Sequence, residues 1–216
     1  MMNPCWALVA VVALAGCAAK PRVPDWQMNA HGALDRYVKA YMAGDARVEA
    51  SEFERARREL ASTGQPGWVA RAELTRCAVR LASLVIESCD GFERLRGDAP
   101  DAERAYADYL AGAVAPQDVG LLAPQHRAVA SGQGGAAAVK AIEDPLSRLV
   151  AAGVLFRSQR ADPQLLALAA ETASAEGWRR PVLAWLGVQA QRAEQAGDLQ
   201  EAQRLRRRIA LAGGER

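Results

Sequence analysis

The side chains that could support catalysis or bind a metal are few and far apart in this 216-residue chain. The only two histidines, His31 and His126, are not part of a zinc-binding His-Glu-x-x-His pattern, and we expect each to be a surface or helix-capping residue. The Gly-rich stretch 131–135 lacks the Gly-Lys-Ser/Thr end of a phosphate-binding loop, so we interpret it as an exposed loop. The sequence therefore predicts neither a catalytic centre nor a metal or other cofactor.

One acidic residue nevertheless suggests an enzyme family. Glu87 followed by Ser88 resembles the catalytic Glu-Ser pair of lytic transglycosylases, which combine helical scaffolds with lipid anchors. In an apolar setting the pKa of a carboxyl group can rise enough for general-acid catalysis. The Gly-Leu-Met-Gln segment that follows in that family is absent here, and a Glu at a helix end is the simpler interpretation. We expect no enzyme, with a cell-wall-cleaving activity as the alternative.

The most specific motif surrounds Cys17. The residues Leu14-Ala15-Gly16-Cys17 end an apolar run, and residues 1–19 carry no charged side chain, as expected of a secretory signal. The four residues resemble the lipobox of bacterial lipoproteins. That resemblance implies removal of residues 1–16 as a signal peptide by cleavage between Gly16 and Cys17, and covalent lipid (a diacylglycerol thioether and an acylated amine, commonly palmitate) on Cys17. Because no Lys or Arg precedes the apolar core, an uncleaved anchor or a plain signal peptide stays open as an alternative.

The lipobox resemblance also implies a location. Ala18 follows the cysteine at a position where Asp would indicate retention in the inner membrane, so in a Gram-negative host we expect the periplasmic face of the outer membrane. Residues 17–26 would be a short lipidated tether. A formal net charge of +2 gives no argument for nucleic-acid binding. The expected partners are therefore the membrane, through the lipid, and an envelope protein.

Cys77 and Cys89 are the cysteines left for other chemistry. In an oxidising periplasm such a pair is expected to form a disulfide. On one continuous helix their Cα atoms would be roughly 18 Å apart, far beyond the roughly 4.4–6.8 Å that a disulfide allows. A disulfide therefore requires a helix end near Ser83 and a chain that folds back; two buried thiols stay open as the alternative. We expect the apolar run 81–86 to be buried in either case.

Helical periodicity extends along the chain, and no strand-like alternation is apparent. Asp144-Pro145 and Asp162-Pro163 each have the form of a helix N-cap followed by proline, and Asp198 with Glu201 has the spacing of a capping box. The sequence predicts an all-α protein with an N-terminal helical region (27–112), an irregular Gly/Pro-rich segment (113–135) and a C-terminal helical region (136–216). We expect residues 27–216 to form one domain.

Two helix pairs share a pattern around an Ala-Gly-Asp turn. Residues 39–50 and 192–202 each contain the end of one helix, this turn and an early Glu-Ala in the next helix. The pattern resembles the tetratricopeptide repeat (TPR), a helix pair of about 34 residues. The match is partial, because neither pair carries the full Trp-Leu-Gly-Tyr set. We predict stacked antiparallel helical hairpins, either as a short TPR-like solenoid or as a generic stack.

Helical hairpins without a catalytic constellation favour protein–protein interaction. We therefore expect a scaffold or adaptor for envelope proteins. A small-ligand site among Trp68, Trp178 and Trp185 is a further alternative. The final helix carries a basic run that could be a solvated face or could contact acidic lipid phosphates or an acidic partner: Arg204, Arg206, Arg207 and Arg208.

Overall fold

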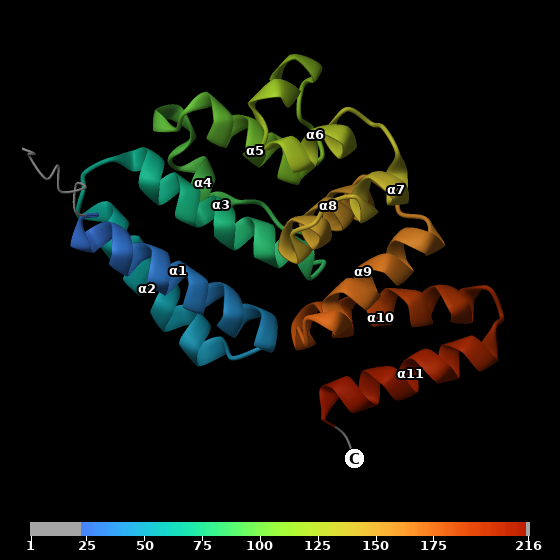
Figure 1. Ribbon diagram of the computed structural model, residues 1–216. Coiled ribbons are helices and arrows are strands. Elements are labelled where there is room, and N and C mark those ends of the chain that lie inside the picture. Colours follow the sequence, from blue (N-terminus) through green and yellow to red (C-terminus); the bar gives the residue numbers. More distant parts are fainter. Residues whose placement is uncertain (1–22, 215–216) are drawn as a thin grey trace, which may run out of the picture.

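The computed structural model describes residues 23–214, and within this range it is helical without any strand, which confirms the predicted all-α class (Figure 1). The long helices of the N-terminal half are α1 (Asp25–Ala43), α2 (Ala46–Ala61), α3 (Pro66–Ala82) and α5 (Asp101–Ala111). The shorter elements are α4 (Asp90–Glu93), η1 (Arg96–Asp98), η2 (Pro116–Leu121), α6 (Pro124–Ala130) and α7 (Gly135–Lys140). The C-terminal part comprises α8 (Pro145–Arg157), α9 (Pro163–Ala175), α10 (Arg179–Gln195) and α11 (Leu199–Gly213).

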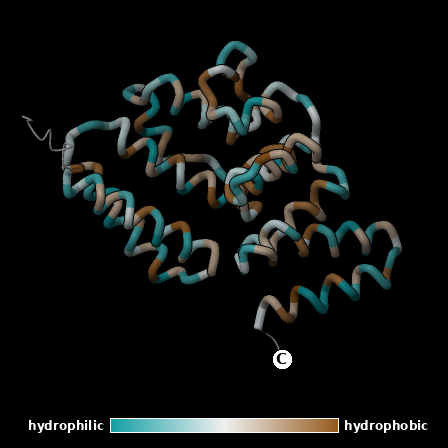
Figure 2. Tube along the Cα trace, viewed as in Figure 1, coloured by the Kyte–Doolittle hydropathy of each residue, from teal (hydrophilic) through white to brown (hydrophobic). Residues whose placement is uncertain are grey.

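The helices pack as hairpins between neighbours in the sequence, as predicted. Helix α1 packs along α2, and α10 packs along both α9 and α11 (Figure 1). Helices α3 and α8 contact each other in the middle of the molecule, and α5 and α6 cover one side of them. Figure 2 shows hydrophilic residues along much of α2 and α11, which belong to the two terminal hairpins. The apolar faces of these helices join those of the other helices in one core.

Four aspartates begin helices in the way that the sequence predicts. Each side chain accepts a hydrogen bond from the backbone N–H three residues further along, at 2.7–3.1 Å. This bond satisfies one of the N–H groups that a helix start leaves without an intrahelical partner. The four capping residues are Asp45, Asp144, Asp162 and Asp198.

A glycine permits the close crossing of the two central helices. Gly153 lies within α8 and is buried, and a Cβ atom added there would lie only 2.6 Å from the main-chain oxygen of Leu81 in α3. No side chain fits at that distance unless one helix moves. The absence of a side chain at Gly153 thus sets how closely α3 and α8 approach.

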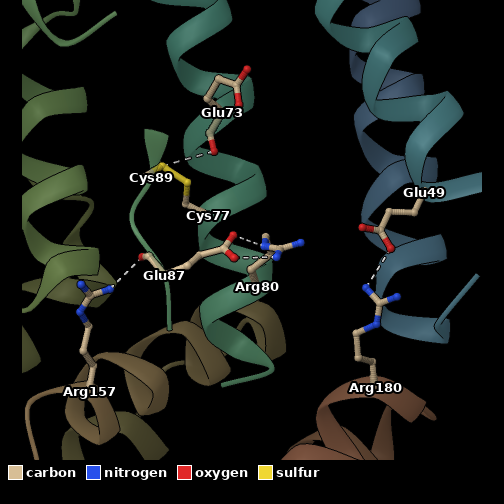
Figure 3. Close-up of polar contacts among 8 residues, drawn as sticks. All are labelled: Glu49, Glu73, Cys77, Arg80, Glu87, Cys89, Arg157 and Arg180. Atoms are coloured by element: carbon tan, nitrogen blue, oxygen red, sulfur yellow. Dashed lines mark hydrogen bonds and ion pairs between the residues drawn. A yellow bond between two sulfur atoms is a disulfide. The ribbon is translucent and has the colours of Figure 1, made fainter. Parts of the chain in front are cut away.

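The terminal hairpins of the chain contact each other through α1 and α10. Arg180 of α10 donates a 2.8 Å hydrogen bond to the carboxylate of Glu49 in α2 (Figure 3). Its guanidinium also lies 4.0 Å from the ring centre of Tyr41, which is a cation–π geometry. Arg180 therefore covers the buried Tyr41 and links α10 to Glu49, which lies 131 positions earlier in the chain.

The apolar run 81–86 is only partly buried, contrary to expectation. Leu81 and Ala82 lie in the core, whereas Val85 and Ile86 are 36% and 47% exposed. The reason is that α3 ends at Ala82, and Leu84 adopts a left-handed backbone conformation (φ 60°) that directs the chain outward. The exposed pair belongs to the segment that returns toward Cys89.

Candidate functional site

The predicted lipidation site, Cys17, and the cleavage position after Gly16 lie outside the described residues. The predicted tether, residues 17–26, overlaps the structure at its end, because α1 already begins at Asp25 and includes Trp26. Within residues 23–214, no helix has both the length and the apolar character needed to cross a membrane.

Cys77 and Cys89 form a disulfide, with their Cα atoms 5.8 Å apart (Figure 3). Cys77 lies inside α3, and Cys89 is the N-cap residue of α4. The helix end that such a disulfide requires is present, since α3 stops at Ala82 with Ser83 as its C-cap. The Sγ atom of Cys89 also lies 3.8 Å from the carbonyl oxygen of Glu73. The disulfide thereby fixes the returning segment along the side of α3.

Glu87 lies in this segment as one member of an ion pair. Arg80 donates a 2.7 Å hydrogen bond to its carboxylate, and this bond raises the pKa of Arg80. Arg157 of α8 donates to the backbone carbonyl of Glu87 at 3.3 Å (Figure 3). The side chain of Glu87 is 44% exposed. These surroundings are not the apolar setting that the cell-wall enzyme alternative needs around its acid.

The two histidines differ in their surroundings. His31 is exposed, as expected, and its Nε2 atom lies 3.6 Å from a carboxylate oxygen of Asp35. The expectation for His126 was wrong, because its ring is buried against those of Tyr109 and Tyr106, at centroid distances of 4.9 and 5.7 Å. The aromatic contacts explain the burial, which lowers the pKa of His126 to about 4.

The basic run of α11 is mostly a solvated face. Arg204, Arg206 and Arg207 are exposed, while Arg208 is half-buried. Arg204 pairs with Glu201 on the same helix, and Arg206 pairs with Glu194 on α10.

Among the described residues, Trp185 is fully buried and so does not face an open pocket together with Trp68 and Trp178, contrary to the small-ligand alternative. Its indole N–H bonds to the carbonyl of Ala82. Trp68 instead packs against Trp26, with ring centroids 5.8 Å apart.

A cavity of about 460 Å³ lies elsewhere, among α3, α5, η2, α6 and α8. Its wall is mainly apolar and includes Leu74, Val79, Leu122, Leu146 and Val150. Polar side chains converge on it from four helices, α3, α5, α6 and α8, and comprise Arg71, Thr75, Glu103, Tyr106, Gln125, His126 and Ser147. Apolar walls with a few convergent polar groups are typical of small-molecule sites. Sequence reasoning missed this cavity.

Glu103 is the buried charge of the cavity. Its side chain is only 7% exposed, and its Oε1 atom pairs with the Nε of Arg71. The second oxygen, Oε2, is buried and has no hydrogen-bond partner. The guanidinium of Arg71 also lies 4.7 Å from the ring centre of Trp68. One signal in the sequence could have revealed the burial of Glu103, because it shares its helix face with the inward residues Tyr106 and Leu110.

Residues 23–214 contain no group of three or more His, Cys, Asp or Glu side chains arranged to hold a metal ion. No protein-family model matches this chain, and neither a curated protein nor a solved structure is significantly similar to it.

Proposed function

We propose that the protein is a lipoprotein anchored through Cys17 at the periplasmic face of the outer membrane, with a helical body that serves as scaffold or adaptor for an envelope protein. The lipobox-like residues 14–17 support the anchor. The binding role is supported by one observation above all, the composition of the free face of α11.

The free face of α11 comprises Arg204, Arg207 and Leu211, which share one side of the helix at helical spacing. Leu211 is 77% exposed, and α11 packs chiefly against α10. Terminal helices of helical stacks normally present a polar outer face to water. Arginine beside an exposed apolar residue is instead typical of protein-binding surfaces, and complementary charge favours an acidic partner.

The anchor is tested by the intact mass and the membrane partition of the protein from its host. We expect a mature chain that starts at acylated Cys17 and sediments with membranes, and a Cys17→Ala variant that carries no acyl chain and is not cut before residue 17. An unmodified wild-type chain would contradict the anchor without bearing on the binding face.

The binding face is tested by chemical crosslinking in the host envelope. We expect one reproducible acidic partner that is lost with Arg204→Glu/Arg207→Glu and retained with Arg55→Glu/Arg58→Glu, a matched pair of exposed arginines on α2. Binding of the purified partner should weaken as salt increases, because salt screens exposed charges. Equal capture by both variants would contradict the assignment of this face.

We assign the protein no catalytic role. The enzyme alternative has a direct test, incubation of the purified protein with peptidoglycan. Release of muropeptides by the wild type, but not by Glu87→Gln, would overturn our assignment.

A further inference from the structure

We propose that the cavity among α3, α5, α6 and α8 binds a small, uncharged, largely apolar molecule whose head group donates a hydrogen bond to the carboxylate of Glu103. This proposal does not depend on the lipid anchor or on the α11 face. It rests on the size of the cavity, on the state of Glu103 and on the charge balance of the polar groups around it.

The size and walls of the cavity fit a ligand of a few fused or linked rings. Its volume of about 460 Å³ lies within the range of roughly 300–1,000 Å³ that small-molecule sites occupy. Leu74, Val79, Leu146 and Val150 contribute apolar surface from α3 and α8. Transfer of apolar ligand surface from water to these walls favours binding.

Glu103 supplies the polar contact. Arg71 satisfies only Oε1, so Oε2 remains a buried acceptor without a donor. Such an unsatisfied polar atom is costly, and few occur in folded proteins. The terminal torsion of a Glu side chain is soft, so rotation of the carboxylate turns an oxygen toward the cavity. An N–H or O–H group of a ligand would then satisfy the acceptor that the protein leaves free.

The charges around the cavity select against anions. The carboxylate of Glu103 cancels the guanidinium of Arg71, and His126 is neutral near pH 7 because burial lowers its pKa to about 4. Tyr106 is neutral near pH 7, as tyrosines ordinarily are, and burial raises its pKa further. The wall therefore offers an anion no net positive charge, and burial of an uncompensated charge is unfavourable.

A fluorescent probe, N-phenyl-1-naphthylamine, tests the proposal. It has an apolar body and one N–H donor, and its emission can be excited by energy transfer from the tryptophans, among them Trp68 beside Arg71. The processed chain, residues 17–216 with Cys17→Ala, is used, so that neither the apolar run 1–16, bound lipid nor detergent takes up the probe. We expect saturable binding. Absence of saturation would overturn the proposal.

Two analogues test the head group. In 1-phenoxynaphthalene an ether oxygen replaces the N–H, and 1-anilinonaphthalene-8-sulfonate adds a negative charge to the same body. We expect each to displace the probe roughly tenfold less well or worse, since hydrogen bonds to charged groups contribute this much. In Glu103→Gln, the preference for the amine over the ether should weaken, because a neutral amide oxygen accepts a hydrogen bond less strongly than a carboxylate does. Equal binding of amine and ether by the wild type would overturn the role of Glu103.

Two tryptophan substitutions test the location. Ala102 is an exposed residue of α5 that lines the cavity, so Ala102→Trp should block entry and abolish probe binding. Ala128 is exposed on α6 and does not line the cavity, so Ala128→Trp should bind the probe like the parent chain. Both substitutions are at exposed sites and leave the core intact. Unchanged binding by Ala102→Trp would place the probe elsewhere and overturn the proposal.

Discussion

The indole N–H of Trp185 donates a 2.9 Å hydrogen bond to the main-chain carbonyl of Ala82, 103 residues earlier in the chain. Ala82 is the last residue of α3, so its carbonyl oxygen has no partner further along that helix. Both residues are fully buried. A side chain from α10 thus completes the hydrogen bonding at the end of α3.

The substitution Trp185→Phe should lower the free energy of unfolding by about 2–4 kcal/mol. It leaves the Ala82 carbonyl without a donor and creates a small cavity, and both effects are destabilising. Urea unfolding followed by circular dichroism measures the change. Trp178→Phe, on a half-buried side chain at the start of the same helix, should cost clearly less. Equal losses in the two variants would show that the bond to Ala82 contributes little.

Substitution of glycine by alanine should have opposite effects at two positions, one at the crossing of α3 and α8 and one inside α10. Gly153→Ala should destabilise the protein by about 1–3 kcal/mol, because the new Cβ would collide with the Leu81 carbonyl. A Cβ atom added at Gly187, inside α10, would meet nothing within 4 Å outside the backbone of its own helix. Gly187→Ala should therefore stabilise by up to about 1 kcal/mol, the gain in helix propensity. Thermal unfolding of both variants checks the sign, and a neutral Gly153→Ala would contradict the tight crossing.

Reduction of the Cys77–Cys89 disulfide should lower the free energy of unfolding by roughly 3 kcal/mol, since the bond restricts the unfolded chain. Urea unfolding with and without a reductant measures this loss. The double variant Cys77→Ala/Cys89→Ala should match the reduced wild type and should not respond to the reductant. A wild type whose unfolding midpoint is the same in both conditions would argue against the disulfide.

The burial of His126 predicts that the folded protein loses stability in mild acid. Burial lowers the pKa of the folded ring to about 4 and outweighs the opposite effect of Asp144, whereas an unfolded histidine titrates near 6.5. As the pH falls from 6.5 toward 4, the unfolded chain gains a proton that the folded chain does not, so stability decreases by up to about 3 kcal/mol. Unfolding measured from pH 7 to 4 should show a shallower decrease in His126→Phe. Identical slopes would contradict the burial of a neutral ring.

Local features of the fold were predictable because their causes are local. An aspartate before a helix acts on an N–H group three residues away, and the glycines after α1 and α10 end those helices within one turn. The hairpins around Asp45 and Asp198 follow from these signals.

The candidate site was not predictable in the same way, because its contacts join distant positions. Glu103 meets Arg71 from 32 residues away, and His126 is buried by residues of another helix. The burial of His126 and the pairing of Glu103 with Arg71 depend on how α3, α5 and α6 pack together, and the periodicity within one segment does not specify that packing. The exposure of Val85 and Ile86 was also missed, because it follows from the end of α3 at Ala82 and the left-handed backbone of Leu84, which the apolar run 81–86 does not indicate.

The contact of Arg180 with Tyr41 and Glu49 imposes an order on the assembly of the chain. The first hairpin leaves the ribosome, or enters a membrane channel, well before residue 180 does. Until α10 follows, the ring of Tyr41 lacks its cationic cover and the carboxylate of Glu49 lacks its partner. Contacts this distant in sequence are associated with slower folding. A nascent chain that stalls before α10 would therefore present an unfinished surface on α1 to chaperones and proteases.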